Sequence, residues 1–121
     1  MASVVLERRA YKHALRLQMR KDYSATIIGA GKSYYKRIDR SGPISPHNIF
    51  HKLKSKLSTI GELYTRHNGN FVGCCAEVNA ANQILNKLPH LKLNQINFSN
   101  AIGPRTMQKI PTCQNCKLTF N

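Results

Sequence analysis

The residues best suited to chemistry are three cysteines and one glutamate in the second half of the chain. Cys75 lies two residues before Glu77, and Cys113 and Cys116 form a C-x-x-C pair close to the end of the sequence. Three thiolates can bind Zn²⁺ and leave its fourth coordination position to water, which is the arrangement of catalytic zinc sites. Glu77 is the only acidic residue from Tyr64 onwards, so we expect it to act specifically as an acid or base.

Two alternatives to a catalytic zinc site remain open from these residues alone. A structural zinc site would need a fourth ligand, which Cys74 or a histidine such as His67 could supply. Such sites usually draw on a second pair of ligands two to four residues apart, whereas the first half of this motif holds only the adjacent Cys74 and Cys75. Cys74 could instead be a buried, inert thiol, but a C-x-x-C pair with a third cysteine favours a metal ion and a reducing compartment.

The motif resembles that of the zinc-dependent nucleoside and nucleobase deaminases, in which a His or Cys two residues before a Glu is followed by P-C-x-x-C. The form found here, from about residue 70 to residue 120, is most similar to the YwqJ-like branch of the polymorphic-toxin deaminases. The similarity includes the segment AIGPRT at 101–106. Thr112 departs from the common pattern, because it separates Pro111 from Cys113.

This resemblance implies hydrolytic deamination of a base in nucleic acid, most simply cytosine to uracil. Cys75, Cys113 and Cys116 would be the ligands of Zn²⁺. Glu77 would be the catalytic proton shuttle, taking a proton from zinc-bound water and delivering protons to the ring nitrogen and the leaving amine.

The resemblance also implies a deaminase-like α/β fold, with three layers α/β/α around a small mixed sheet. Only 5 residues follow Cys116, so the C-terminal strands of that fold are expected to be missing or shortened. We expect one domain over residues 1–121, with a zinc-site core at 70–121 and a basic N-terminal half at 1–66.

The charge of the chain favours a polyanionic partner. The formal net charge is +14, and residues 1–66 carry 14 Lys and Arg against 4 Asp and Glu. Such a charge attracts DNA or RNA, most simply single-stranded or with a flipped base, and has no use in binding a small neutral nucleoside. A deaminase of free cytidine and a zinc-stabilised nucleic-acid-binding module without catalysis are the two alternatives.

Residues 3–21 have the periodicity of a helix with one apolar and one basic face. Four basic side chains recur at every fourth position on one face: Arg8, Lys12, Arg16 and Arg20. Like charges at this spacing cost about 0.2–0.5 kcal/mol per pair in an isolated helix, so an adjacent anion such as a phosphate would stabilise them. A solvated helix face is the alternative.

The remaining elements follow from periodicity and from glycine and proline positions. We expect strands at 25–28 and 34–38 joined through 29–32, a helix capped by Ser45 and running to about residue 64, a turn at 67–70, a helix at 75–87, an approximate strand at 91–98, a loop at 99–110, and a final helix from Pro111 or Thr112.

Five residues near the motif are candidates for substrate binding. They precede the motif helix or follow the strand at 91–98: Asn68, Asn70, Phe71, Ser99 and Asn100. An amide can bind a base edge and an aromatic ring can stack on a base. The alternative is that they are ordinary turn residues and a core phenylalanine.

The sequence also bears on location and partners. It contains no apolar run as long as a membrane span and no apolar N-terminal signal segment. The cysteines favour action in a reducing intracellular compartment, cytoplasm or nucleus. The toxin-like resemblance adds delivery as a secreted effector domain, with an immunity-type or carrier protein as partner.

Overall fold

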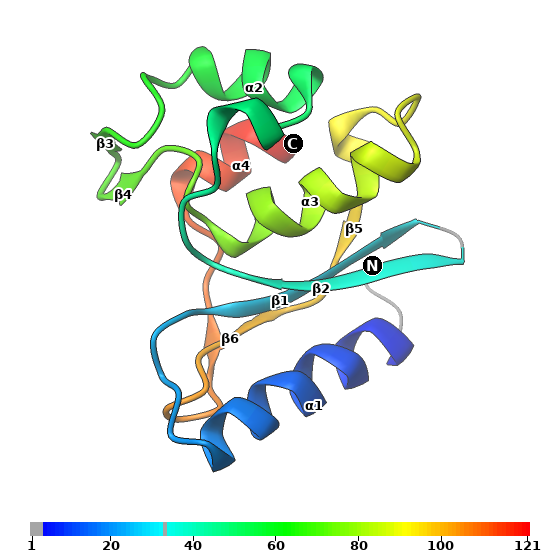
Figure 1. The fold of residues 1–121 in the computed structure, drawn as a ribbon, viewed down its shortest axis with the longest axis vertical. Helices are drawn as coiled ribbons and strands as arrows, with labels where there is room; N and C mark the ends of the chain where they lie inside the picture. Colours follow the sequence, from blue (N-terminus) through cyan, green and yellow to red (C-terminus); the bar gives the residue numbers. More distant parts are fainter. Residues whose placement is uncertain (1–3, 33) are drawn as a thin grey trace.

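In a computed structural model of the chain, which describes residues 4–32 and 34–121, helices lie on both faces of a small sheet (Figure 1). The helices are α1 (Val4–Met19), α2 (His51–Ser58), α3 (Ala76–Lys87) and α4 (Gln114–Phe120), with 3-10 turns η1 (Pro46–Asn48) and η2 (Leu93–Gln95). The strands are β1 (Ile27–Lys32), β2 (Tyr35–Arg40), β3 (Arg66–His67), β4 (Asn70–Phe71), β5 (Asn97–Phe98), β6 (Ala101–Ile102) and β7 (Lys109–Ile110). The predicted α/β class is confirmed, and the deaminase-like form of it stays a prediction.

The main sheet has the strand order β2-β1-β6-β7, with β5 also pairing with β1. All its pairs among the described residues are antiparallel, so the predicted mixed sheet is wrong. Connectivity explains two of these pairs: β1 and β2 form a hairpin, and β6 and β7 pair after a short connection, whereas parallel pairs need a long crossover.

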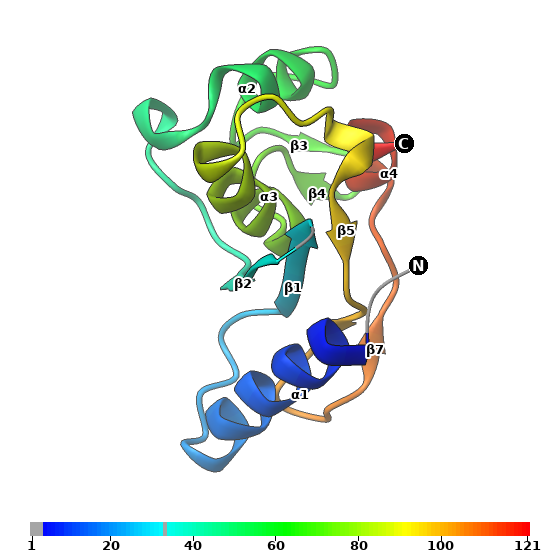
Figure 2. The same cartoon turned by 90° about the vertical axis from the view of Figure 1, so that its right-hand side faces the viewer.

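Strand β1 lies between two hydrophobic cores because its side chains alternate between the two faces of the sheet. Ile27 packs with residues of α1, including Ala14, on one face. Ile28 and Ala30 pack on the other face with the core formed by α2, α3 and α4. Figures 1 and 2 show α1 on one side of the sheet and the other three helices on the opposite side.

The predicted link at 29–32 belongs to strand β1. Gly29 allows α1 to lie close to the sheet, since a Cβ there would be only 2.8 Å from Cδ1 of Leu6. The predicted first helix agrees with α1, although Ser3, its expected first residue, lies outside the described residues. Gly29, which favours a turn in the sequence, therefore allows a close contact between a helix and a strand in the structure.

The predicted helix at 46–64 is shorter and interrupted. η1 and α2 are separate, and the Ser45 side chain makes no capping hydrogen bond. Asn82 on α3 fills the break: its Oδ1 accepts from the Phe50 N–H at 2.7 Å, and its Nδ2 donates to the Asn48 carbonyl at 2.7 Å. The interruption thus ties α2 to the helix that begins at the cysteine motif.

Other segments differ from prediction near the C-terminus. The predicted strand at 91–98 is reduced to η2 and β5, and the predicted loop at 99–110 contains β6 and β7. Helix α4 begins at Gln114, with Cys113 in the N-cap position, a few residues after the predicted start at Pro111 or Thr112. Among the described residues, no helix combines the length and apolar character needed to cross a membrane.

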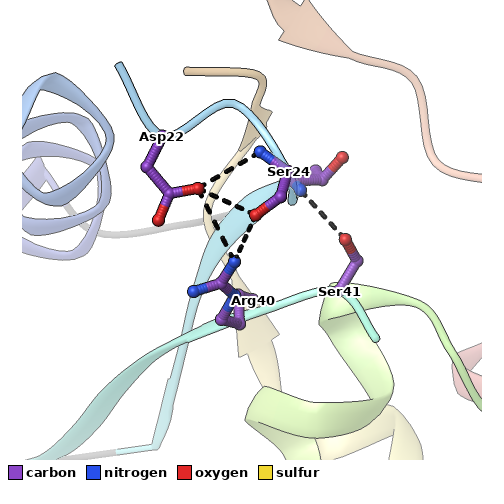
Figure 3. Close-up of polar contacts among 5 residues, drawn as sticks. Asp22, Ser24, Arg40 and Ser41 are labelled. Carbon is purple, nitrogen blue, oxygen red and sulfur yellow. Dashed lines mark hydrogen bonds and ion pairs between the residues drawn. The ribbon is translucent and has the colours of Figure 1, made fainter. Parts of the chain in front are cut away.

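A polar cluster joins the α1–β1 connection to the end of β2 (Figure 3). The Oδ1 of Asp22 accepts from the Ser24 hydroxyl at 2.8 Å, and Arg40 donates to that hydroxyl at 2.7 Å. Arg40 lies 3.9 Å from Asp22 as an ion pair. Beside them, the N–H of Thr26 donates to Oγ of Ser41 at 2.9 Å, which fixes the starting point of β1 against the end of β2.

Candidate metal centre

Three of the four cysteines converge where two helices begin. Cys75 is the N-cap of α3, Cys113 is the N-cap of α4, and Cys116 is buried in the first turn of α4. Their Sγ atoms all lie within 4.8 Å of one another, and those of Cys75 and Cys113 are 3.1 Å apart. Tetrahedral Zn²⁺ with Zn–S bonds of about 2.3 Å separates its sulfur ligands by about 3.8 Å, so small shifts would let these thiols bind one ion. The predicted ligand set is therefore brought together, and it could hold a metal ion.

The three thiols do not hold their protons equally. The thiols of Cys116 and Cys75 donate to Cys113 and lower its pKa to about 2, and the backbone N–H groups of Cys116 and Asn115 act in the same direction. The contact with Cys113 raises the pKa of Cys75 to about 12 and also raises the pKa of Cys116. Cys113 is thus the favoured thiolate, and a metal ion that binds here must displace the protons of the other two.

Neither possible fourth ligand from the sequence joins this group. Among the described residues, the clustered metal-binding atoms belong to Cys75, Cys113 and Cys116, without Cys74 or His67. The carbonyl of Cys74 accepts from the Gly42 N–H at 2.8 Å, and burial raises the pKa of its thiol. The described chain thus supplies three ligand atoms, which is the number found in catalytic zinc sites.

Glu77 lies beside the cysteine group in the first turn of α3. Its side chain is buried, with 7% of its surface exposed. Burial raises the pKa of the carboxyl, and the nearby charge of Cys113 adds to the rise, whereas hydrogen bonds with its own backbone and with the Cys116 thiol oppose it. Because the carboxylate is not one of the clustered ligand atoms, it is placed next to the candidate metal position without being part of it.

An open cavity of about 520 Å³ adjoins the cysteines and Glu77. Its walls come from the start of β1, the end of β2, the β3–β4 hairpin and the segment before α4. The lining side chains besides the motif include Thr26, Ser41, Arg66, Asn70, Phe71, Ala101, Ile110 and Thr112. A planar base can be accommodated in this volume with both polar and apolar contacts.

The five predicted substrate-binding residues lie in different places. Asn70 and Phe71 line the cavity. Asn68 lies in the hairpin turn and donates to Oδ1 of Asn115 at 2.9 Å. Ser99 lines a smaller hollow of about 210 Å³ that also reaches Glu77 and Cys116. Asn100 donates through its backbone to Glu7 of α1 at 2.9 Å, away from the cysteine cavity.

Two further residues belong to this site by position. Asn115 is the third residue of the C-x-x-C segment, and its side chain holds the β3–β4 hairpin by hydrogen bonds to the carbonyls of His67 and Asn70. Arg66 lies opposite Phe71 in that hairpin. The Asn-Gly pair at 68–69 indicates a two-residue hairpin turn and could have placed Arg66 opposite Phe71, whereas nothing local to Asn115 indicates its long-range partners.

The predicted basic face lies on the far layer of the molecule. Arg8, Lys12 and Arg16 are exposed on α1 and Arg20 is exposed just after its end, across the sheet from α3 and α4 (Figure 1). The only ion pair within residues 4–32 and 34–121 joins Arg40 and Asp22, so Arg8, Lys12 and Arg16 have no ion-pair partner there, whereas the charge of Arg20 acts on the Asp22 carboxylate. These exposed basic side chains can bind an anion, but they do not line the cysteine cavity.

Comparison of the chain with protein-family models, with curated proteins and with solved structures gives no match. The functional proposal is therefore based on the sequence motif and on the geometry of the site.

Proposed function

We propose that this chain is a zinc-dependent deaminase that converts a base within nucleic acid, with cytosine as the first candidate. The observation that supports this proposal most strongly is the placement of Glu77. Its buried carboxylate lies beside three clustered thiols without being one of the clustered ligand atoms, and it lines an open cavity. This is the relationship that a proton carrier, a metal ion and a substrate require.

The donor set suits zinc. Cys75, Cys113 and Cys116 would hold the ion, and soft thiolate ligands at close range favour Zn²⁺ over magnesium or calcium. Two of the three are helix N-caps, where the partial positive charge of the helix end stabilises a thiolate. When bound, zinc would supply a Lewis acid that makes a water molecule nucleophilic at neutral pH.

Glu77 would move the protons of the reaction. Burial disfavours the charged carboxylate and raises the pKa of Glu77 above that of an exposed glutamate, which is the direction that helps a carboxyl group to accept a proton and pass it on. We assign to it the transfer of one proton of the attacking water to N3 of cytosine and then of the other to the departing amino group. Water adds to C4, ammonia leaves, and the product is uracil.

The substrate class follows from charge and access. A net charge of +14 favours a nucleic acid over a free nucleoside. A base in a stacked duplex cannot reach a buried carboxylate, so the target must be single-stranded or flipped out. The exposed basic face of α1 supports nucleic-acid binding by charge alone, with no sequence preference.

The direct test is conversion of defined oligonucleotides. Zinc-loaded protein is incubated with DNA and RNA strands that contain cytosine and adenine in several contexts, and the products are sequenced. We expect cytosine to be read as uracil, and a chelator-treated sample to show no change. If no base changes in any strand while zinc stays bound, the protein is a zinc-stabilised binding module and the enzymatic proposal is wrong.

A further inference from the structure

We infer that the β3–β4 hairpin is a stacking platform for the nucleotide next to the target base, built from Phe71 and Arg66. This inference rests on the proposed function, since it takes the target base to occupy the cysteine cavity. It extends that function by naming the substrate as a single strand that is read at two adjacent nucleotides.

The first support is the position of the two side chains. Arg66 and Phe71 are paired across the hairpin, and both line the cavity. The guanidinium carbon of Arg66 lies 5.3 Å from the centre of the Phe71 ring. Even so, 49% of the phenylalanine surface is exposed, which leaves room for another flat group against the ring.

The second support is that the platform is fixed before any ligand binds. Asn68 and Gly69 have positive φ angles of 53° and 82°, as a tight two-residue hairpin turn requires. Asn115 has only 2% of its surface exposed and bonds the hairpin at three points: the carbonyls of His67 and Asn70 and the side chain of Asn68. Because the backbone of the hairpin is held in this way, the exposed ring that it carries can bind a ligand with little loss of backbone conformational entropy.

The third support is the depth of the two parts of the cavity. Glu77 is buried and Phe71 is half exposed, and both line the same cavity, so a base bound at the carboxylate would have its neighbouring nucleotide in the more exposed part of the cavity, where the ring lies. All bases have a π face, and arginine adds attraction to the ring and to the adjacent phosphate. A paired, stacked neighbour has no free face, which favours single-stranded nucleic acid.

The test is a binding measurement that does not depend on conversion. Zinc-loaded Glu77→Gln protein binds fluorescently labelled single strands with one central cytosine, and anisotropy gives the dissociation constant. Adding Phe71→Ala should weaken binding roughly 5- to 150-fold, the range expected for loss of one base–aromatic stack. Phe71→Leu, which keeps an apolar side chain in the hairpin, should weaken it similarly. Tyr34→Ala is the matched control, because Tyr34 is 100% exposed and lies away from the cysteine cavity.

A second strand makes the test specific for the neighbouring base. In this strand the nucleotides on both sides of the cytosine lack bases. Phe71→Ala should then have little effect, because the stacked group is already absent. Equal weakening on both strands, no weakening on the intact strand, or no binding of any strand by the parent protein would overturn the platform. Wild type could convert no base while Phe71→Ala still weakens binding only of the strand that keeps its neighbouring bases. In that case the deaminase proposal fails, and the hairpin remains a stacking platform for a base of a single strand.

Discussion

The side-chain nitrogen of Asn115 donates a hydrogen bond to the carbonyl oxygen of His67 at 2.9 Å, across 48 positions of the chain. Asn115 lies between two candidate metal ligands, and His67 begins the turn of the hairpin at the mouth of the cavity. The metal-binding segment and the hairpin are therefore one structural unit. Metal binding that orders the start of α4 should therefore also order the hairpin.

Asn115→Ala should loosen the hairpin without removing the metal ion. The change leaves the carbonyls of His67 and Asn70 without this donor, and loss of a partly buried hydrogen bond of this kind costs about 0.5–1.5 kcal/mol. We expect a lower melting temperature and faster amide exchange at 66–71, with zinc content unchanged. Gln114→Ala is the control, because that neighbouring side chain is exposed. Unchanged exchange at the hairpin would show that Asn115 does not hold it.

The metal site is tested by single cysteine changes. Cys75→Ser, Cys113→Ser and Cys116→Ser should each lose most bound zinc, because each removes one of three clustered thiols. Cys74→Ser should keep the wild-type zinc content, measured by elemental analysis of the purified protein. If Cys74→Ser loses zinc as fully as the other three, Cys74 is a fourth ligand and the site is structural.

The basic face of α1 is tested by the salt dependence of binding. If Arg8, Lys12, Arg16 and Arg20 bind phosphates, replacing all four with Gln should lower the slope of log K against log salt by roughly 0.7–0.9 for each phosphate that is no longer neutralised. Lys54→Gln with Lys56→Gln provides a control on the exposed side of α2. An unchanged slope for the four-residue variant would mean that this face is only solvated.

Asp22 should contribute to stability in a pH-dependent manner. Hydrogen bonds from the Ser24 hydroxyl and backbone lower the pKa of Asp22 below its ordinary value of 3.8. Because the folded-state pKa is the lower one, the carboxylate stabilises the fold above the unfolded-state pKa, and this contribution is lost as the pH falls through the folded-state pKa. Asp22→Asn should therefore melt below wild type near neutral pH, and the difference should shrink below about pH 4. A difference that is constant from about pH 7 to pH 3 would contradict this role.

The separate parts of the site were largely predictable from the sequence because their determinants are local, whereas the meeting of Cys75 with Cys113, 38 positions away, was expected only from the family resemblance. Helix periodicity after Cys75 and the C-x-x-C spacing place three thiols at helix starts, and α3 and α4 begin within a few residues of the predicted positions. The predicted turn at 67–70 is also present, as the turn of the β3–β4 hairpin, although the two short strands that flank it were not predicted. Patterns formed by residues a few positions apart thus predict the separate parts of the site.

The rest depends on contacts between distant residues. The break before α2 is stabilised by Asn82, which lies 32 positions from its partner Phe50. Strands β6 and β7 are two residues each, too short for an alternating pattern to indicate them. Gly29 favours a turn by composition, but close contact with Leu6 explains it in a strand. These contacts join residues that are distant in the sequence, so a pattern of neighbouring residues does not indicate them.

The most direct measurement for the central claim compares wild type with Glu77→Gln. The amide cannot accept a proton, so conversion of cytosine in a single strand should fall by about 10⁴-fold or more, the upper end of general acid–base effects. Zinc content and melting temperature should stay near wild type, because the carboxylate is not among the clustered ligand atoms. Glu62→Gln, which changes an exposed carboxylate, should convert cytosine at the wild-type rate. Conversion by Glu77→Gln at the wild-type rate, or absence of conversion by zinc-loaded wild type in both DNA and RNA, would contradict the account.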